Sequence, residues 1–504
     1  MSKLLIAGRW CEGESIDTLR DSFSGTAYGE MHVASAAQVE DAVSGAVEAA
    51  AESDLGPYDR YRILMEASRV LASRREQLVT TMRNEAGFTR AEGENEVSRC
   101  IQTLELSAEE AKRLNGELVP MLAASGARDR MGFTIRAPRG VICAITPFNS
   151  PLNTLAHKVG PAIAAGNAVI VKPSSYTPLS AVALCEALIE AGLPPRLLAL
   201  LHGPGGRIGR QLLADQRIAY YAFTGSTQVG REIQQAAGLR GTQLELGSIA
   251  STIVCDDADI ELAVPKILNA GFRKAGQVCT SVQRLLVDRR IEVAFTARLV
   301  EAVRAVKAGD PADPDVLVGP MISLAHAERA EKWVAEAVAA GAKILAGGTR
   351  EGAVMAPTVL TNVDQRMKVV CEEIFAPVLS IIPFDTVEEA VERANASPYG
   401  LAAGLFTANL HRAMRMARSL RFGGVHVNEA SSARVDVMPF GGGRRTARGV
   451  GHRGAPRRGV GRDPLRRGKS YGIGPRSPRL CRSGNVRRAA DNDLLLTPRT
   501  GCRR

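Results

Sequence analysis

Residues 141–174 read VICAITPFNSPLNTLAHKVGPAIAAGNAVIVKPS. Apolar runs of strand length stand near both ends of this stretch, at 141–145 and 168–171. The residues at 155–165 are rich in alanine and favour a buried helix. A strand, a helix and a strand in this order predict two parallel strands joined by a crossover helix.

The same alternation continues along the chain. Further apolar runs lie at 197–201, 218–223 and 243–246, and another helical segment lies at 179–191. Together they predict a doubly wound parallel sheet covered on both faces, with a ligand at the carboxyl ends of its strands. A second alternating region runs from 252 to about 427, with strands near 284–287, 378–384 and 401–406 and helices near 291–306, 324–340 and 387–395. Two successive α/β domains predict an active site in the cleft between them.

Other segments have simpler patterns. Residues 1–57 predict an extended segment followed by an alanine-rich helix, and 60–116 have apolar residues at helical spacing. Residues 121–138 predict a pair of strands with a turn near Gly126.

The chain has 504 residues and a formal net charge of +11, which by itself suggests nucleic acid as a partner. Residues 441–504, however, hold 18 Lys and Arg against 3 Asp, whereas the rest of the chain has four more acidic than basic side chains. The body is therefore mildly acidic, and we do not expect nucleic acid as a partner. The tail has 13 Gly and 17 Arg and no periodicity, so we expect 443–504 to be disordered.

The composition also indicates the class of protein and its cellular compartment. Hydrophobic residues make up 45% and charged residues 23%, as in globular proteins. The sequence has no apolar run of about 18 residues for a membrane span, and it begins too polar for a secretion signal. Nine scattered cysteines indicate neither a disulfide framework nor a metal cluster. We expect a cytoplasmic protein without a metal or a membrane partner.

Three residues carry candidate chemistry. Cys279 stands among small and polar residues in GQVCTS, which suits an accessible thiolate; the alternative is a small buried cysteine. Glu245 ends a predicted strand between two leucines, where burial would equip it as a general base; the alternative is a structural ion pair. Asn149 follows a strand and either donates to an oxyanion or caps the next helix.

Three further segments suggest nucleotide binding. FTGSTQVG, residues 223–230, predicts a strand–turn–helix in which Gly225 permits close approach and Ser226 opens a helix for a pyrophosphate. GPGGRIG, residues 203–209, suggests a phosphate loop. Lys172 ends a strand, where a cation suits nucleotide recognition, although solvated lysines are also common there.

Together these segments resemble the NAD(P)-dependent aldehyde dehydrogenase superfamily. The resemblance runs from about residue 4 to Gly442 and includes HKVGPAIAAGNAVIVKPS, FTGSTQVG, LELGS, GQVCTSVQR, CEEIFAPVL and VNEASSARVDVMPFGG. It implies an α/β fold with a Rossmann-like cofactor domain, an α/β catalytic domain and a small β oligomerisation element. The implied boundaries are 1–120 and 139–247 for the cofactor domain, 248–430 for the catalytic domain, 121–138 for the oligomerisation strands, 431–442 for an active-site loop and 443–504 for the atypical tail.

The resemblance assigns the chemistry. Cys279 is the nucleophile that adds to an aldehyde, and Asn149 with the Cys279 backbone N–H holds the oxyanion. Hydride then passes to NAD or NADP, and Glu245 activates the water that hydrolyses the thioester to a carboxylate. The alternative is an inactive or assembly-defective relative with an altered C-terminus.

The resemblance also assigns the cofactor site. Its residues are Ile145, Thr146, Pro147, Phe148, Lys172, Ser175, Gly205, Gly209, Phe223, Gly225, Ser226, Val229, Leu246, Glu373 and Phe375. Ser175 stands where strict NAD users often carry Glu, and it neither grips a ribose diol nor repels a 2′-phosphate, so both NAD and NADP stay open. Ser150 and Asn153 hint at a small or polar aldehyde. The family assembly implies a homodimer or homotetramer, if the altered C-terminus permits it.

Two departures from the family pattern stand out. Ser248 replaces the second glycine of LELGG, and we expect this small residue to be tolerated. After Gly442 the sequence turns to Arg, Gly, Pro and Ala with almost no acid, as GC-rich DNA does when read out of frame. We hypothesise a frameshift near Gly442; the alternative is a genuine basic tail that binds nucleic acid or a membrane. Translating this gene region in its other two frames tests the idea, which fails if neither frame gives a family-like ending.

Overall fold

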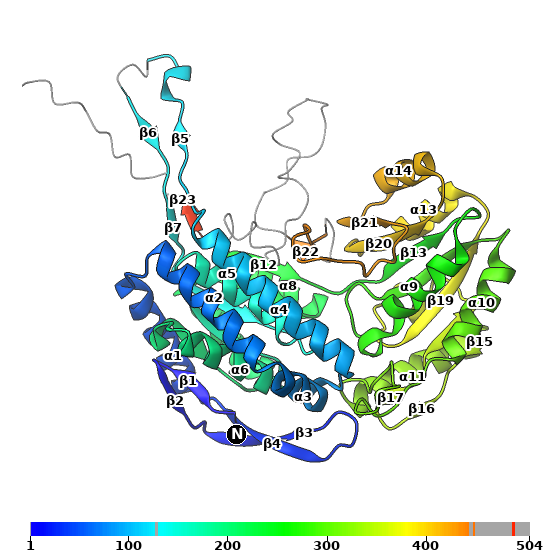
Figure 1. The fold of residues 1–504 in the computed structure, drawn as a ribbon, viewed down its shortest axis with the longest axis horizontal. Coiled ribbons are helices and arrows are strands. Elements are labelled where there is room, and N and C mark those ends of the chain that lie inside the picture. Colours follow the sequence, from blue (N-terminus) through cyan, green and yellow to red (C-terminus); the bar gives the residue numbers. More distant parts are fainter. Residues whose placement is uncertain (1, 127–129, 443–446, 449–485, 489–504) are drawn as a thin grey trace, which may run out of the picture.

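The computed structural model describes residues 2–126, 130–442, 447–448 and 486–488. Two sheets flanked by helices lie side by side, and a thin two-stranded arm projects from the first of them (Figure 1). The predicted succession of two α/β domains is confirmed. In the part of the chain that the structure describes, no helix is long and apolar enough to cross a membrane.

The first sheet contains the predicted parallel strands. Its order is β2-β1-β10-β9-β8-β11-β12-β22. The bounds are β1 Leu4–Ile6, β2 Arg9–Cys11, β8 Val141–Ile145, β9 Ala168–Lys172, β10 Leu198–Leu200, β11 Ile218–Thr224, β12 Gly241–Glu245 and β22 Ala447–Arg448. From β8 the chain adds β9 and β10 on one side and then returns to add β11 on the other. The carboxyl ends of β8 and β11 therefore form a topological switch point, where such sheets bind ligands.

Helices cover both faces of this sheet. They are α1 Ala36–Glu52, α2 Pro57–Ser73, α3 Arg75–Ala86, α4 Arg90–Ala111, α5 Asn153–Ala164, α6 Pro178–Glu190, α7 Arg210–Ala214 and α8 Thr227–Ala237, with short turns at η2 Pro195–Leu197 and η3 Gly205–Gly209. Every residue of α5 is buried, because the helix packs against α4 on one side and β8 and β9 on the other. This burial on all sides explains its apolar sequence.

The second sheet has the order β15-β18-β19-β14-β13-β20-β21. Its strands are β13 Ala250–Val254, β14 Val282–Asp288, β15 Lys343–Ala346, β18 Thr358–Thr361, β19 Val378–Phe384, β20 Ala402–Phe406 and β21 Gly424–Val427. The remaining elements of this domain are η4 Arg273–Gly276, α9 Ile260–Phe272, α10 Glu292–Arg304, α11 Leu324–Ala339, α12 Lys368–Cys371, α13 Val387–Asn395, α14 Leu410–Ser419 and the hairpin β16 Arg350–Glu351 with β17 Val354–Met355. The strands and helices expected here lie within a few residues of their predicted bounds.

The projecting arm corrects one prediction. Its strands are β5 Leu118–Val119 and β6 Gly132–Phe133, so the first strand precedes the predicted 121–138 range, and Met121–Ala123 is a 3-10 turn. The reason is Pro120, which lacks an N–H for the ladder and ends the strand. Gly126 has φ +82°, as a turn at this point requires. The other short strands are β3 Ser15–Arg20, β4 Ala27–Val33, β7 Arg136–Pro138 and β23 Val486–Arg488.

The tail also differs in part from expectation. Five of the residues predicted to be disordered form strands: β22 pairs with β12, and β23 pairs with β7. Both β12 and β7 present an open edge whose backbone groups accept any extended segment, whatever its side-chain pattern. The rest of 443–504 lies outside the described residues.

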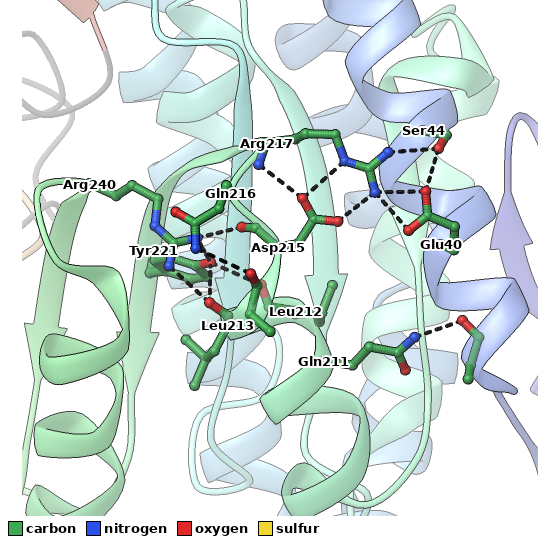
Figure 2. Close-up of polar contacts among 12 residues, drawn as sticks. Glu40, Ser44, Gln211, Leu212, Leu213, Asp215, Gln216, Arg217, Tyr221 and Arg240 are labelled. Carbon is green, nitrogen blue, oxygen red and sulfur yellow. Dashed lines mark hydrogen bonds and ion pairs between the residues drawn. The ribbon is translucent and has the colours of Figure 1, made fainter.

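A polar network ties the helices of the first domain together, as Figure 2 shows. Arg217 binds Asp215 and Glu40 of α1, and Gln211 of α7 donates to the Ala36 carbonyl. Arg240 donates to the Leu213 carbonyl at 2.9 Å and to the Tyr221 hydroxyl at 2.6 Å. It also donates to the carbonyls of Ala236 and Ala237. One guanidinium thus caps the carboxyl ends of α7 and α8.

We predict that Arg240→Met lowers the free energy of unfolding by about 2 kcal/mol, because several carbonyls lose a charged donor. Denaturant unfolding measures the change. Arg231→Met is the matched control, since Arg231 lies on the exposed face of α8. Equal stability of the two variants would contradict the assignment.

Candidate active site

A cavity of about 700 Å³ opens between the two domains. Nine of the predicted site residues line it: Pro147, Phe148, Asn149, Gly225, Ser226, Leu246, Cys279, Glu373 and Phe375. They come from loops after β8, β11 and β12 of the first sheet and from loops of the second domain. The cavity therefore lies where the sequence predicts an active site, at the switch point of the first sheet and between the two domains.

Cys279 differs from the buried thiols in its exposure, and from the half-buried Cys11 and Cys371 in its place at the cavity. It is half-buried and lines the cavity, whereas Cys100, Cys143, Cys185 and Cys255 are buried in the core. Burial raises the pKa of Cys143 to about 12 and that of Cys255 to about 11, so those thiols stay protonated and inert. The alternative of a small core cysteine therefore fails for Cys279.

Asn149 crosses the domain boundary. Its Nδ2 donates to the Gln277 carbonyl at 2.7 Å, two residues before Cys279. Helix α5 begins later, with Leu152 at its N-cap, so the helix-capping alternative for Asn149 is wrong. An amide nitrogen carries two N–H groups, so one can hold this loop while the other serves an oxyanion.

Glu245 is buried at the carboxyl end of β12, with 2% of its surface exposed. Its neighbour across the ladder is Thr224 of β11, and its carbonyl accepts from Gly225 N at 3.0 Å. Lys158, which is not among the residues predicted from the sequence, is equally buried and donates its Nζ to Thr224 Oγ1 at 2.9 Å. A lysine inside the apolar α5 was a signal that could have revealed it.

The far wall of the cavity is cationic. Arg273 is half-buried, donates to Ser432 Oγ at 2.5 Å, and has no carboxylate within ion-pair distance among the described residues. Asp436 instead neutralises Arg99, whose guanidinium donates two hydrogen bonds of 2.9 and 2.7 Å to the Asp436 carboxylate. Burial works against ionisation of Asp436, but hydrogen bonds from His157 and Arg99 hold its pKa well below the usual range.

These wall residues are not among the residues predicted from the sequence. Arg273 and Lys274 directly precede GQVC, and two cations beside a candidate nucleophile could have been noticed. Arg99 and Asp436 are 337 positions apart, and the sequence contains no signal that would pair them.

Other expected cofactor residues, Lys172 and Ser175 among them, lie along the same sheet edge and are not part of the cavity lining. Lys172 is 5% exposed, and burial lowers the pKa of its ammonium to about 8. One of its three N–H groups goes to the Pro173 carbonyl at 3.0 Å, which leaves donors for a ribose hydroxyl. Ser175 Oγ donates to the Gly203 carbonyl at 3.1 Å.

Glycine-rich turns leave room for a ligand. A Cβ at Gly205 or Gly209 would meet no heavy atom within 4 Å apart from those of the adjoining backbone, so the space beside these glycines is open. Ser226 caps α8 by accepting from Val229 N at 3.3 Å, and the other amino-end N–H groups of this helix suit a pyrophosphate. Phe223 of β11 pairs with Ile145 of β8, and Thr146 N donates to the Lys172 carbonyl at 3.2 Å. These features fit a dinucleotide.

The second domain closes the site with Glu373 and Phe375. Glu373 Oε1 accepts from Ser248 N at 2.8 Å, and burial raises the pKa of Glu373 to about 7. Ser248 itself is buried and fits without displacing this contact, as expected for a small residue. Phe375 has φ +53°, and its ring stands edge-on to Phe148 at 5.9 Å. Among the described residues no cluster could hold a metal ion.

Comparisons with known proteins agree with one another. The model of the aldehyde dehydrogenase family matches residues 10–458, which extends past Gly442. The chain is 45% identical over 447 residues to 3-sulfolactaldehyde dehydrogenase of Priestia megaterium, covering 88% of this chain and 93% of that protein.

Solved structures are similar over most of the chain. The glyceraldehyde-3-phosphate dehydrogenase GapN of Methanocaldococcus jannaschii, complexed with NADP, has a TM-score of 0.85 and 33% identity, covering 94% of this chain and 98% of its own. An NAD-dependent aldehyde dehydrogenase of Sinorhizobium meliloti has a TM-score of 0.85 and 32% identity, covering 89% and 90%.

We predict that the affinity for NAD(P) increases by up to about 10-fold between pH 6 and pH 8, if Glu373 accepts from the cofactor ribose. Below its pKa of about 7 Glu373 is protonated and accepts poorly; above it the carboxylate accepts well, so binding favours the ionised form. Calorimetric titration measures the affinity at each pH. Glu373→Gln should remove the pH dependence, while Glu372→Gln, at the exposed neighbour, should keep it. A wild-type affinity that is constant from pH 6 to pH 8 would count against this role.

Proposed function

The chain belongs to the aldehyde dehydrogenase family and is an NAD(P)-dependent enzyme that oxidises aldehydes, and we propose that its substrate is a short aldehyde with an anionic group. The observation that carries this proposal is Arg273. Its guanidinium is half-buried beside Cys279 and has no carboxylate partner among the described residues. A desolvated cation of this kind is costly unless an anion joins it.

The surroundings of Arg273 support an anion of modest size. Arg99 is also close to Cys279, but Asp436 already neutralises it. Ser432 and Thr280 add hydroxyl groups to the same wall. A carboxylate, sulfonate or phosphate would fit the planar donor fork of Arg273. The names of two relatives agree, since 3-sulfolactaldehyde and glyceraldehyde-3-phosphate both carry an anionic group.

The proposed reaction begins at Cys279. Its thiolate forms a bond to the aldehyde carbon, and the carbonyl electrons move to the oxygen. The second N–H of Asn149 Nδ2 and the backbone N–H of Cys279 stabilise this oxyanion. When bound, NAD(P) supplies the hydride acceptor that makes the step an oxidation. What stays on Cys279 is a thioester.

Glu245 completes the reaction. Buried at the end of β12, it takes a proton from the water that attacks the thioester, and the carboxylate product leaves with the thiolate restored. Lys172 and the turn at Gly225 and Ser226 hold the cofactor. Ser175 carries no charge to reject a 2′-phosphate, so we propose that both NAD and NADP bind.

We also propose that the chain assembles through its arm. Leu118, Leu122, Phe133 and Ile135 are large apolar residues that are about half or more exposed there, and a second copy would cover them. A monomeric mass by light scattering would contradict this.

The seven cysteines among the described residues are all free, which supports a reducing compartment such as the cytoplasm. The alternative of an inactive relative is not supported, because the similar proteins are named as dehydrogenases.

The substrate proposal predicts a charge-selective loss. Arg273→Met should raise KM for succinic semialdehyde by about 10- to 100-fold and leave butanal, a neutral aldehyde of equal length, unchanged. NAD(P)H formation measures both. Arg298→Met, at a half-buried arginine that does not line the cavity, is the control. Cys279→Ala should abolish both activities and Cys371→Ala neither. A wild type that prefers butanal, with Arg273→Met unchanged, would refute the anionic substrate.

A further inference from the structure

Three consecutive residues before the catalytic loop adopt a left-handed backbone. Lys274 has φ +53°, Ala275 has φ +51° and Gly276 has φ +69°. Gly276 has no alternative, since a Cβ there would lie 2.1 Å from the Ala376 carbonyl oxygen. The first two carry side chains in a conformation that costs free energy and persists only where neighbours enforce it.

The neighbours that enforce it lie on α4 of the other domain. Glu92 accepts from the Lys274 backbone N–H. Glu96, which is fully buried, accepts from Lys274 Nζ at 2.8 Å. The same ammonium lies 4.3 Å from the centre of the Phe88 ring. A buried ion pair therefore anchors the strained segment.

Glu96 also holds the oxyanion loop. Its Oε1 accepts from Ser150 Oγ at 2.6 Å and from Asn153 N at 3.0 Å. Lys274 Nζ donates in turn to the Asn149 carbonyl at 2.9 Å. The pair is thus bonded to the segments on both sides of the reacting centre.

Hydrogen bonds connect Lys274, Gln277 and Asn149 in a closed ring. Gln277 Nε2 donates to the Lys274 carbonyl at 3.2 Å, and Asn149 Nδ2 donates to the Gln277 carbonyl at 2.7 Å. Each member is fixed by two others, so a shift of the ion pair displaces Asn149 and Cys279 relative to each other. A misplacement of about 1 Å in such a centre can cost about 100-fold in rate.

We propose that the buried Glu96–Lys274 ion pair is the positioning device that holds Asn149 and the Cys279 loop in register across the domain boundary. Glu96 is fully buried, and the Lys274 ammonium, although Lys274 lines the cavity, is engaged by Glu96 and the Asn149 carbonyl. The inference rests on the proposed function, since it assumes the roles given to Asn149 and Cys279.

The test compares single and double replacements. Glu96→Gln and Lys274→Met each leave one buried charge unpaired, so each should lower both Tm and kcat. The double variant Glu96→Gln/Lys274→Met has no unpaired charge and should recover Tm. We expect kcat to stay about 10- to 100-fold low in all three, with KM for succinic semialdehyde within about three-fold of the wild type. Recovery of kcat together with Tm in the double variant would show a merely structural pair and overturn the proposal.

Two controls sharpen the experiment. Glu94→Gln changes a half-exposed carboxylate on the same helix, paired with Arg90, and should leave kcat unchanged. The rate of Cys279 alkylation by iodoacetamide should change in the double variant, because it reports the position of the loop without substrate or cofactor. If the charge variants do not fold, Ser150→Ala carries the test. A three- to ten-fold loss of kcat supports the proposal, and a change below two-fold overturns it.

The variants distinguish a failure of the proposed function from a failure of the proposed positioning role. If Cys279→Ala remains active, the proposed function itself is wrong. If Cys279→Ala is inactive while Glu96→Gln and Lys274→Met fold and keep the kcat of the wild type, only the positioning role is wrong.

Discussion

The hydrogen bond from the Asn149 side chain to the Gln277 carbonyl joins the two domains at the point where the chemistry takes place. Asn149 follows a strand of the first sheet, and Gln277 leads into the loop that carries Cys279. A hydrogen-bond donor stabilises an oxyanion effectively only when it is in place before the charge develops, because moving the donor during the reaction would cost free energy and cancel the stabilisation. The cavity, its cationic wall and the cofactor edge are all arranged around this junction.

Around this junction the polar groups are divided between two tasks. Glu96, Lys274 and Asp436 are almost fully buried and bonded to other residues, so they hold the frame. Arg273 lacks a carboxylate partner among the described residues, and so it is suited to a substrate. A low dielectric strengthens the attraction within a pair of charges and raises the free-energy cost of an unpaired charge. A paired charged side chain therefore holds the structure, whereas an unpaired one favours the binding of an oppositely charged substrate.

Much of this could be predicted from the sequence, since apolar runs and their spacing reflect burial directly. The strands β8 and β11 and the helices α10, α11 and α13 lie close to their expected bounds. The arm begins a few residues earlier than its sequence pattern predicts, because Pro120 ends its first strand. Two pieces of the tail pair with open sheet edges although they lack a strand pattern. Pairing at a sheet edge uses backbone N–H and C=O groups, which every sequence carries, so no side-chain pattern predicts it.

The fold class, the order of the elements and the residues suited to nucleophilic and cofactor roles follow from the amino-acid sequence, because local patterns and motifs carry that information. That Asn149 bonds the Cys279 loop rather than a helix end follows only from the way the two domains pack. The tertiary structure also decides that Arg99 is neutralised by Asp436, that Arg273 is not, and that Glu96 pairs with Lys274. These outcomes depend on contacts between residues up to 337 positions apart, and the charge left in a pocket is known only when every partner has been placed.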